Sequence, residues 1–224
     1  MSDVESLIRD SAALLMDFDG PVCKLFAGYP ASEIADQLRR SLSITGPDVP
    51  PGPNPLKVLL WVSEHRPELL DRAEELLIAG ELAAVGSASP TPHAASVFVA
   101  AQSRGIPMAV ASNNAPEAVL RYLSLHGLTP YVIDVSGRTR GHPERMKPDP
   151  DSLLRAASAL GIPATACLLV GDAPSDMEAA RKAGSRRIGY AKTTDRASAL
   201  VEAGAQSIVH GMDALEAALV KAGA

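Results

Sequence analysis

The 224-residue chain has few cysteines and few aromatic residues, and both shortages exclude classes of protein. Its two cysteines, Cys23 and Cys167, have no CxxC spacing, so neither a zinc site nor a disulfide framework is indicated. We expect both to be packing residues. Aromatic residues make up only 4% of a chain that is 46% hydrophobic, so we expect a mostly aliphatic core.

Long apolar runs and an excess of basic charge are also missing. No stretch approaches the ~20 apolar residues of a membrane span, and residues 12–16 are too short a run for a signal peptide. The net charge of -5 argues against nucleic-acid binding, and the chain lacks the nucleotide motifs GxxxxGK[ST] and GxGxxG. We therefore expect a cytosolic protein with neither a membrane nor a nucleic-acid partner; its oligomeric state stays open.

From residue 90 onward, apolar strand-like runs alternate with helical stretches rich in Ala and Leu, which is typical of a parallel sheet. Strands are expected near residues 12–17, 107–112, 131–135, 166–171, 186–190 and 207–210. Helices are expected near 93–104, 116–125, 151–160, 176–183, 195–203 and 212–221. Glycines follow four of these helices where a left-handed residue is favoured, at Gly105, Gly127, Gly161 and Gly184. Asp151 and Asp195 are expected helix N-caps.

Residues 24–90 break this alternation and are predicted to be helical. One helix opens at Ser32, a second at Asn54-Pro55, and a third runs from Pro67 to Gly80. Five prolines between residues 47 and 55 predict a stiff connector. We expect an α/β fold with a Rossmann-like three-layer core and a mostly parallel sheet. Residues 1–22 and 91–224 would form this core, and residues 23–90 an inserted helical domain.

Two carboxylates, Asp17 and Asp19, follow the first predicted strand with one residue between them. Side chains at i and i+2 point the same way at the end of a strand, and at ~4 Å two such anions repel by roughly 4 kcal/mol at an effective dielectric of ~20. A hard cation such as Mg²⁺ would remove this repulsion. The alternative is an Asp-Gly turn in which both carboxylates bind only local backbone.

Two later segments carry groups that suit a phosphate ligand. Ser112-Asn113-Asn114 ends the second expected strand of the core with hydroxyl and amide donors. Taken alone, Ser112 is more often an ordinary cap of the next helix. Lys147 lies in Met146-Lys147-Pro148-Asp149-Pro150, where two prolines fix the backbone around one ammonium. An isolated lysine is more often a solvated surface group.

The segment from Leu168 to Asp176 repeats the design of the first strand, with Asp172 and Asp176 following its apolar run. These two anions add to the first pair, so a bound cation becomes the more favoured interpretation. The alternative for Asp176 is a cap of the helix that begins at Met177. All four segments lie at predicted strand ends, where open α/β sheets bind their ligands.

In this order the four segments resemble the motifs of the haloacid dehalogenase-like superfamily. The matching residues are DxDG at Asp17 to Gly20, [ST]N at Ser112-Asn113, Lys147-Pro148, and GDxxxD from Gly171 to Asp176. The helical insertion after the first motif resembles the C1 cap of members similar to phosphoglycolate phosphatase and β-phosphoglucomutase. The set covers most of the chain and is specific as an ordered whole.

The resemblance implies a phosphatase that acts on a small phosphorylated metabolite. Asp17 would attack phosphorus to form an aspartyl-phosphate, and Asp19 would protonate the leaving alcohol and then activate water. Mg²⁺ would be held by Asp17, the main-chain carbonyl of Asp19, and Asp172, with Asp176 nearby.

The resemblance also implies that Ser112, the Asn113 amide and Lys147 hold the phosphoryl oxygens. One departure is Pro21, since the family usually has Thr after DxDG. Proline lacks both the hydroxyl and the backbone donor, so one local hydrogen bond must be replaced or lost.

Other functions remain open at this point. Asp19 favours phosphate esters over the substrates of dehalogenase and phosphonatase branches, which lack this carboxylate. A phosphomutase for a sugar phosphate could use the same core, and so could a binding domain without activity. The substrate itself is not predicted. Residues that could reach a ligand from the cap are Lys24, Phe26, Trp61, His65 and Arg66. A basic loop before Lys147 could meet an acidic substrate or be solvated: Arg138, Arg140, His142 and Arg145.

Overall fold

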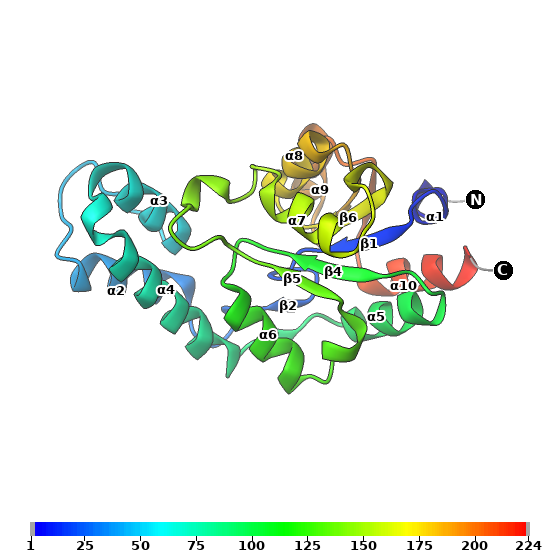
Figure 1. The fold of residues 1–224 in the computed structure, drawn as a ribbon, viewed down its shortest axis with the longest axis horizontal. Coiled ribbons are helices and arrows are strands. Elements are labelled where there is room, and N and C mark those ends of the chain that lie inside the picture. Colours follow the sequence, from blue (N-terminus) through cyan, green and yellow to red (C-terminus); the bar gives the residue numbers. More distant parts are fainter. Residues whose placement is uncertain (1–2, 223–224) are drawn as a thin grey trace.

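The computed structural model describes residues 3–222, and a six-stranded sheet runs through its centre (Figure 1). The strand order is β5-β4-β1-β6-β7-β8, and all neighbouring strands are parallel. The strands are β1 (Ala13–Met16), β4 (Met108–Ala111), β5 (Asp134–Ser136), β6 (Cys167–Gly171), β7 (Arg186–Tyr190) and β8 (Ser207–Val209). This confirms the predicted α/β class and parallel sheet.

Helices cover both faces of the sheet and complete three layers (Figure 1). They are α1 (Asp3–Arg9), α5 (Ala94–Ser103), α6 (Pro116–Leu125), α7 (Asp151–Ala159), α8 (Pro174–Ala183), α9 (Thr194–Glu202) and α10 (Met212–Lys221). Leu14 and Met16 of β1 pack with residues of α5, α6 and α10, whereas Leu15 packs with α7 and α8. Because β1 is buried on both faces, its sequence is continuously apolar. No helix between residues 3 and 222 is long and apolar enough to cross a bilayer.

Most of the predicted elements are found within three residues of their expected bounds. The strand expected at 131–135 is displaced because residues 129–131 form a 3-10 turn, η2 (Thr129–Tyr131), before β5 begins. The four glycines predicted after helices all have the left-handed backbone conformation, with φ between 66° and 74°. The helix α1 was not expected.

Both predicted aspartate N-caps are wrong. Asp151 lies inside the first turn of α7, where its side chain accepts a hydrogen bond from Arg155, and the cap position holds Pro150. For α9 the hydroxyl of Thr193 accepts from the Arg196 N–H, and this bond caps the helix two residues before Asp195. Acidic residues also favour the first turn of a helix, so composition alone does not fix the cap.

The inserted segment contains α2 (Ala31–Ser41), α3 (Pro55–His65) and α4 (Leu70–Val85), with η1 (Pro67–Leu69) between the last two. These helices, coloured blue to teal, lie at one end of the molecule, opposite the termini (Figure 1). A short antiparallel pair, β2 (Cys23–Lys24) and β3 (Ser89–Pro90), joins the segment to the core. No local pattern indicates these two-residue strands, and the expectation that residues 24–90 are entirely helical is therefore corrected.

Helix α4 continues past Gly80, where a helix end was predicted, to Val85. Gly80 serves packing instead, since a Cβ there would lie 2.9 Å from Cγ2 of Ile34 on α2. The first half of α4 packs in an apolar cluster of the inserted helices, and Ala84 and Val85 at its end pack in the core of the sheet domain.

Helix α4 thus contributes to both apolar clusters. The predicted domain boundaries, residues 1–22 with 91–224 for the core and 23–90 for the inserted domain, stay a prediction. Residues 1–2 and 223–224, at the ends of the predicted core, lie outside the described residues.

The proline-rich connector places the start of α3. Arg39 of α2 donates hydrogen bonds to the carbonyls of Pro50 and Gly52 and so holds this connector against α2. The Asn54 side chain accepts from the Leu56 N–H at 2.9 Å, and Pro55 follows as the first helical residue, as predicted. These contacts thereby fix the start of α3 near the carboxyl ends of the central strands, which are described below.

We expect Gly80→Val to destabilise the protein by about 1–3 kcal/mol, because the new side chain must displace the buried Ile34. The measurement is urea unfolding followed by circular dichroism. Ala79→Val is the control, since it places the same side chain at an exposed position of the same helix without the clash. Helix propensity falls in Ala79→Val and rises in Gly80→Val, so a larger loss of stability at Gly80 cannot come from propensity. Equal losses for the two variants would contradict this account of Gly80.

Candidate active site

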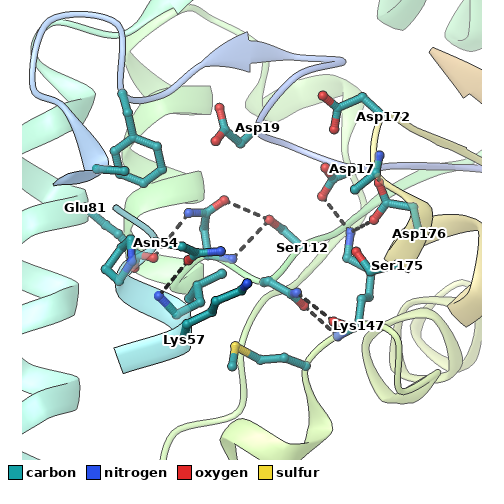
Figure 2. A pocket seen from close by; sticks show the side chains of 18 of the residues that line it. Asp17, Asp19, Asn54, Lys57, Glu81, Ser112, Lys147, Asp172, Ser175 and Asp176 are labelled. Carbon is teal, nitrogen blue, oxygen red and sulfur yellow. Dashed lines mark hydrogen bonds and ion pairs between the residues drawn. The ribbon is translucent and has the colours of Figure 1, made fainter. Parts of the chain in front are cut away.

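The four motif segments meet at the carboxyl ends of the central strands. β1 lies between β4 and β6, so Asp17, Ser112 and Asp172 follow three adjacent strands. Lys147 reaches the same point from the segment between β5 and α7. Figure 2 shows Asp17, Asp172 and Asp176 turned toward one another on one side of the pocket. The expectation that these groups converge is confirmed by the geometry.

Lys147 is the cation at the centre of this arrangement. Its Nζ lies 2.7 Å from Oδ1 of Asp17 and 2.6 Å from Oδ1 of Asp176, and it donates to the Ala111 carbonyl at 3.0 Å. The side chain is 2% exposed, so the interpretation of Lys147 as a solvated surface group is wrong. Three acceptors surround an ammonium that can donate three hydrogen bonds.

Burial and the neighbouring charges set the protonation of these groups. Burial raises the pKa of Asp17, the charge of Asp176 raises it further, and Lys147 opposes both effects. Burial alone would lower the pKa of Lys147, but the carboxylates of Asp17 and Asp176 outweigh it and raise that pKa above its ordinary value. Burial and the charge of Asp176 raise the pKa of Asp172 to about 6. Lys147 is therefore protonated at neutral pH.

One oxygen each of Asp17, Asp172 and Asp176 lies within 4.8 Å of the others. Three carboxylates at this spacing with one ammonium carry a net negative charge, and oxygen donors are the ligands that Mg²⁺ prefers. The donor set therefore fits a hard divalent cation. Asp176 is not the cap of a helix that begins at Met177, because α8 begins at Pro174 and Ala173 holds the cap position. The Asp176 side chain, in the first turn, accepts from the Ala173 N–H at 2.9 Å.

Two glycines allow the carboxylates to come this close. A Cβ at Gly20 would lie 2.5 Å from Cγ of Asp172, and Gly20 has a φ of 121°, which favours glycine. A Cβ at Gly171 would lie 2.5 Å from Cβ of Asp176. Any side chain at either position would displace a carboxylate.

Asp19 is held apart from the carboxylate cluster. Its Oδ1 accepts a hydrogen bond from the Leu25 N–H at 2.9 Å. Burial raises its pKa, the bond from Leu25 lowers it, and the charge of Glu81 raises it. A carboxyl group with a raised pKa at the wall of a pocket suits a group that gives and takes a proton. Between the two aspartates, Phe18 is buried and packs edge-on against Tyr122 of α6, with ring centroids 5.2 Å apart.

The Pro21 position has a replacement for the missing threonine hydroxyl. Thr91 donates a hydrogen bond from its hydroxyl to the Gly20 carbonyl at 2.6 Å, and its N–H donates to the Val22 carbonyl at 3.1 Å. A residue 70 positions later in the chain thus stabilises the turn after Asp19. Sequence reasoning identified the departure at Pro21 but not its partner.

Ser112 and Asn113 have different local partners. The Ser112 hydroxyl donates to Oδ1 of Asn114 and accepts from the Asn114 N–H, both at 3.1 Å, and Ala115 holds the cap position of α6. Ser112 is therefore no helix cap. The Asn113 side chain accepts from the Lys147 N–H at 2.8 Å and donates to the Lys147 carbonyl at 3.2 Å. Asn113 thus ties the strand-end loop to the lysine segment.

A pocket of about 580 Å³ opens over these groups, between the carboxyl ends of the central strands and the inserted helices. On the side of the strand ends it is lined by Asp17, Asp19, Ser112, Lys147, Asp172 and Asp176, among others. On the side of the inserted segment the lining includes Phe26, Asn54, Leu56, Lys57 and Leu60, and Glu81 also lines it. Lys57 extends from α3 into the pocket (Figure 2).

Of the expected cap residues, only Phe26 lines this pocket; Lys24 lines an adjoining hollow, and Trp61 stacks on His65 instead. Asn54 was recognised in the sequence as a helix cap but not as a pocket residue. The residues of the basic loop do not line this pocket either. Each pairs with an acidic side chain: Arg138 with Glu74 and Glu81, Arg140 with Glu75, His142 with Glu144, and Arg145 with Asp151.

Comparison with known proteins places the chain in a family. The phosphoglycolate phosphatase of Escherichia coli (strain K12) is 33% identical over 98 residues, which are 44% of this chain and 38% of the relative, so the match spans about two fifths of that protein. The protein named "phosphoglycolate phosphatase, plasmid" of Cupriavidus necator is 29% identical over 231 residues and 94% of each chain.

Among solved structures, a predicted phosphatase from Clostridium acetobutylicum matches with a TM-score of 0.75 at 17% identity, over 94% of this chain and 99% of that one. At this identity the likeness shows the fold alone. A family model described as haloacid dehalogenase-like hydrolase matches residues 55–184, more than half of the chain. The protein therefore belongs to the haloacid dehalogenase-like hydrolases.

Proposed function

We propose that the protein is a Mg²⁺-dependent phosphatase that hydrolyses a small phosphorylated metabolite through an aspartyl-phosphate. The observation that carries this proposal is the buried Asp17 carboxylate, with one oxygen on the Lys147 ammonium at 2.7 Å and with Asp19 lining the same pocket. Phosphoryl transfer requires a nucleophile, a proton carrier and cationic groups around one phosphorus. The two phosphatases among the relatives support this choice.

In this mechanism Lys147 holds Oδ1 of Asp17, so Oδ2 is the oxygen that attacks phosphorus and displaces the alcohol. Asp19 gives its proton to the departing oxygen and then takes one from the water that hydrolyses the acyl phosphate. The Ser112 hydroxyl, the Asn113 main-chain amide and Lys147 bind the phosphoryl oxygens. For this the Ser112 hydrogen turns away from Oδ1 of Asn114, and the Lys147 ammonium exchanges one of its three present acceptors for a phosphoryl oxygen. The Asn113 side chain is already engaged with the Lys147 main chain, so its contribution there is to hold the lysine segment.

The residues that would hold Mg²⁺ are Asp17, the main-chain carbonyl of Asp19, and Asp172, with Asp176 supporting them. When bound, the ion supplies positive charge that offsets the charge of the phosphoryl oxygens.

The pocket favours hydrolysis over the alternative of sugar-phosphate isomerisation. A mutase requires a second acid–base group opposite the nucleophile. Among the described residues, the inserted helices contribute one carboxylate to the pocket wall, that of Glu81, and both of its oxygens accept hydrogen bonds from the core. Lys57 and Asn54 add polar donors to an otherwise apolar wall, which suits a small polar leaving group. 2-Phosphoglycolate is the first candidate, because two relatives carry that substrate in their names.

Asp17→Asn should abolish phosphate release from p-nitrophenyl phosphate and 2-phosphoglycolate, with a loss on the order of 10³-fold or more, because the amide is not a nucleophile. The measurement is free phosphate with MgCl₂ present, alongside a circular dichroism spectrum that shows the fold is kept. Asp71→Asn, at an exposed position of α4, is the control and should keep full activity. Equal turnover by Asp17→Asn and the parent would refute the nucleophile assignment, and conversion of a sugar phosphate to its isomer without free phosphate would favour the mutase.

MgCl₂ should raise the melting temperature at about pH 7.5 and raise it much less at about pH 5, because protons compete with the metal once the pH falls below the Asp172 pKa of about 6. The metal-free protein should show the opposite trend from this group. A carboxyl whose folded pKa is raised adds stability at low pH, and that stability is lost as the pH rises through about 6. Asp172→Asn is the control and should weaken the Mg²⁺ effect at both pH values. If MgCl₂ does not change the melting temperature at pH 7.5, the result would contradict the proposed metal site.

A further inference from the structure

Glu81 of α4 is a buried carboxylate that the proposed mechanism does not use, and it contacts the loop that carries Ser112. Its side chain is fully buried. Oε2 accepts from the Ala115 N–H at 3.0 Å, and Oε1 accepts from Nδ2 of Asn114 at 3.2 Å. An inserted helix thus holds both the main chain and a side chain of the loop after β4.

Arg138 completes this contact from the other side of the loop. Its Nη1 and Nη2 donate to the two oxygens of Glu81 at 3.0 and 3.3 Å, and Nη1 also donates to the Asn113 carbonyl at 2.8 Å. The Arg138 N–H donates to the Asn114 carbonyl at 2.9 Å. The loop is therefore fixed at three successive residues by one buried ion pair. The Glu81 carboxylate, which extends from α4, contacts the N-terminal end of α6, where the helix dipole favours a negative charge.

The charge of Glu81 also fixes which way the Asn114 amide points. A carboxylate only accepts hydrogen bonds, so Nδ2 of Asn114 must face Glu81, and Oδ1 must face the Ser112 hydroxyl, 3.1 Å away. The Asn114 N–H donates to the same hydroxyl oxygen at 3.1 Å. The Ser112 oxygen is thereby held in one position, which depends on a residue of the inserted segment. Its single hydrogen, which Oδ1 of Asn114 accepts here, turns to a phosphoryl oxygen when phosphate binds, while the Asn114 N–H keeps the Ser112 oxygen in place.

We infer that Glu81 is a positioning residue for phosphate binding, which it supports by holding Asn114 and, through Asn114, the Ser112 hydroxyl. The inference rests on the proposed function of Ser112 as a phosphate ligand. Glu81 would not touch the phosphate, since both of its oxygens are already used and its charge would repel an anion. It links the helices above the pocket to the loop that binds the reacting group.

The chain provides a matched control seven residues away on the same helix. Glu74 is as deeply buried as Glu81 and accepts from Nε of the same Arg138 at 3.1 Å. Its Oε1 has no hydrogen-bond partner among the described residues, and none of its bonds goes to the loop after β4. Glu74→Gln and Glu81→Gln therefore make the same change of charge and size, but only the second reaches Ser112.

The experiment measures binding of inorganic phosphate by calorimetry in MgCl₂, with the melting temperature of each variant. Gln has a single NH₂ group, which in Glu81→Gln faces either Nδ2 of Asn114 or the Ala115 N–H. In both orientations one hydrogen bond between α4 and the loop after β4 is lost, so the loop is held less firmly. We expect phosphate to bind about tenfold more weakly in Glu81→Gln and within about twofold of the parent in Glu74→Gln. Asn114→Ala, which leaves the Glu81–Arg138 pair in place, should reproduce the loss and replaces Glu81→Gln if that variant does not fold.

A double-mutant cycle with Ser112→Ala separates positioning from a general loss of structure. If Glu81 acts through Ser112, Glu81→Gln should weaken phosphate binding little further in the Ser112→Ala background, while its effect on the melting temperature persists. The inference would be overturned if Glu74→Gln and Glu81→Gln weakened phosphate binding equally. It would also be overturned if Glu81→Gln weakened phosphate binding as much in the Ser112→Ala background as in the parent. A parent protein that releases no phosphate from any ester would refute the proposed function instead, whereas parent and Glu81→Gln binding phosphate equally would refute the positioning alone.

Discussion

The Lys147 ammonium between Asp17 and Asp176 is the interaction on which the site depends. Carboxylates that follow two adjacent strands lie close together at the carboxyl ends of those strands. At ~4 Å each pair would repel by roughly 4 kcal/mol at an effective dielectric of ~20. The ammonium offsets part of this repulsion and fixes one oxygen of Asp17. Its segment is positioned in turn by Asn113, which exchanges two hydrogen bonds with the Lys147 main chain. Asp17, Lys147 and the loop after β4 thus form one connected unit.

Much of the fold could be predicted because local rules and global packing agree in the core. Continuous apolar runs such as Ala13–Met16 belong to strands buried on both faces, and the glycines that end the helices adopt left-handed conformations that other residues avoid. Prediction failed where a contact distant in the sequence decides the structure. Gly80 signals a helix end by composition, yet it lies inside α4 because Ile34 of another helix occupies the space that a side chain would need.

The same distinction applies to the site. Asp17, Asp172 and Lys147 could be found because each directly follows a strand or a fixed turn, and parallel strands bring such positions together. Arg138 could not be interpreted correctly, since its basic neighbours suggest a solvated loop while its real partners, Glu74 and Glu81, come from a helix more than 50 residues earlier. The replacement of a missing threonine hydroxyl by Thr91 is of the same kind, because a partner 70 residues away leaves no local pattern.

Helix α4 has its first half among the inserted helices and its last turns in the core. Replacing the inserted segment with one from another hydrolase would therefore also change side chains that pack in the core. A graft cut at the β2 and β3 ribbon would remove both Glu74 and Glu81, the partners of Arg138, whereas a cut within α4 at Gly80 would keep Glu81 and its bonds to Arg138. The boundary that recombination can tolerate thus lies inside a helix and not in a loop.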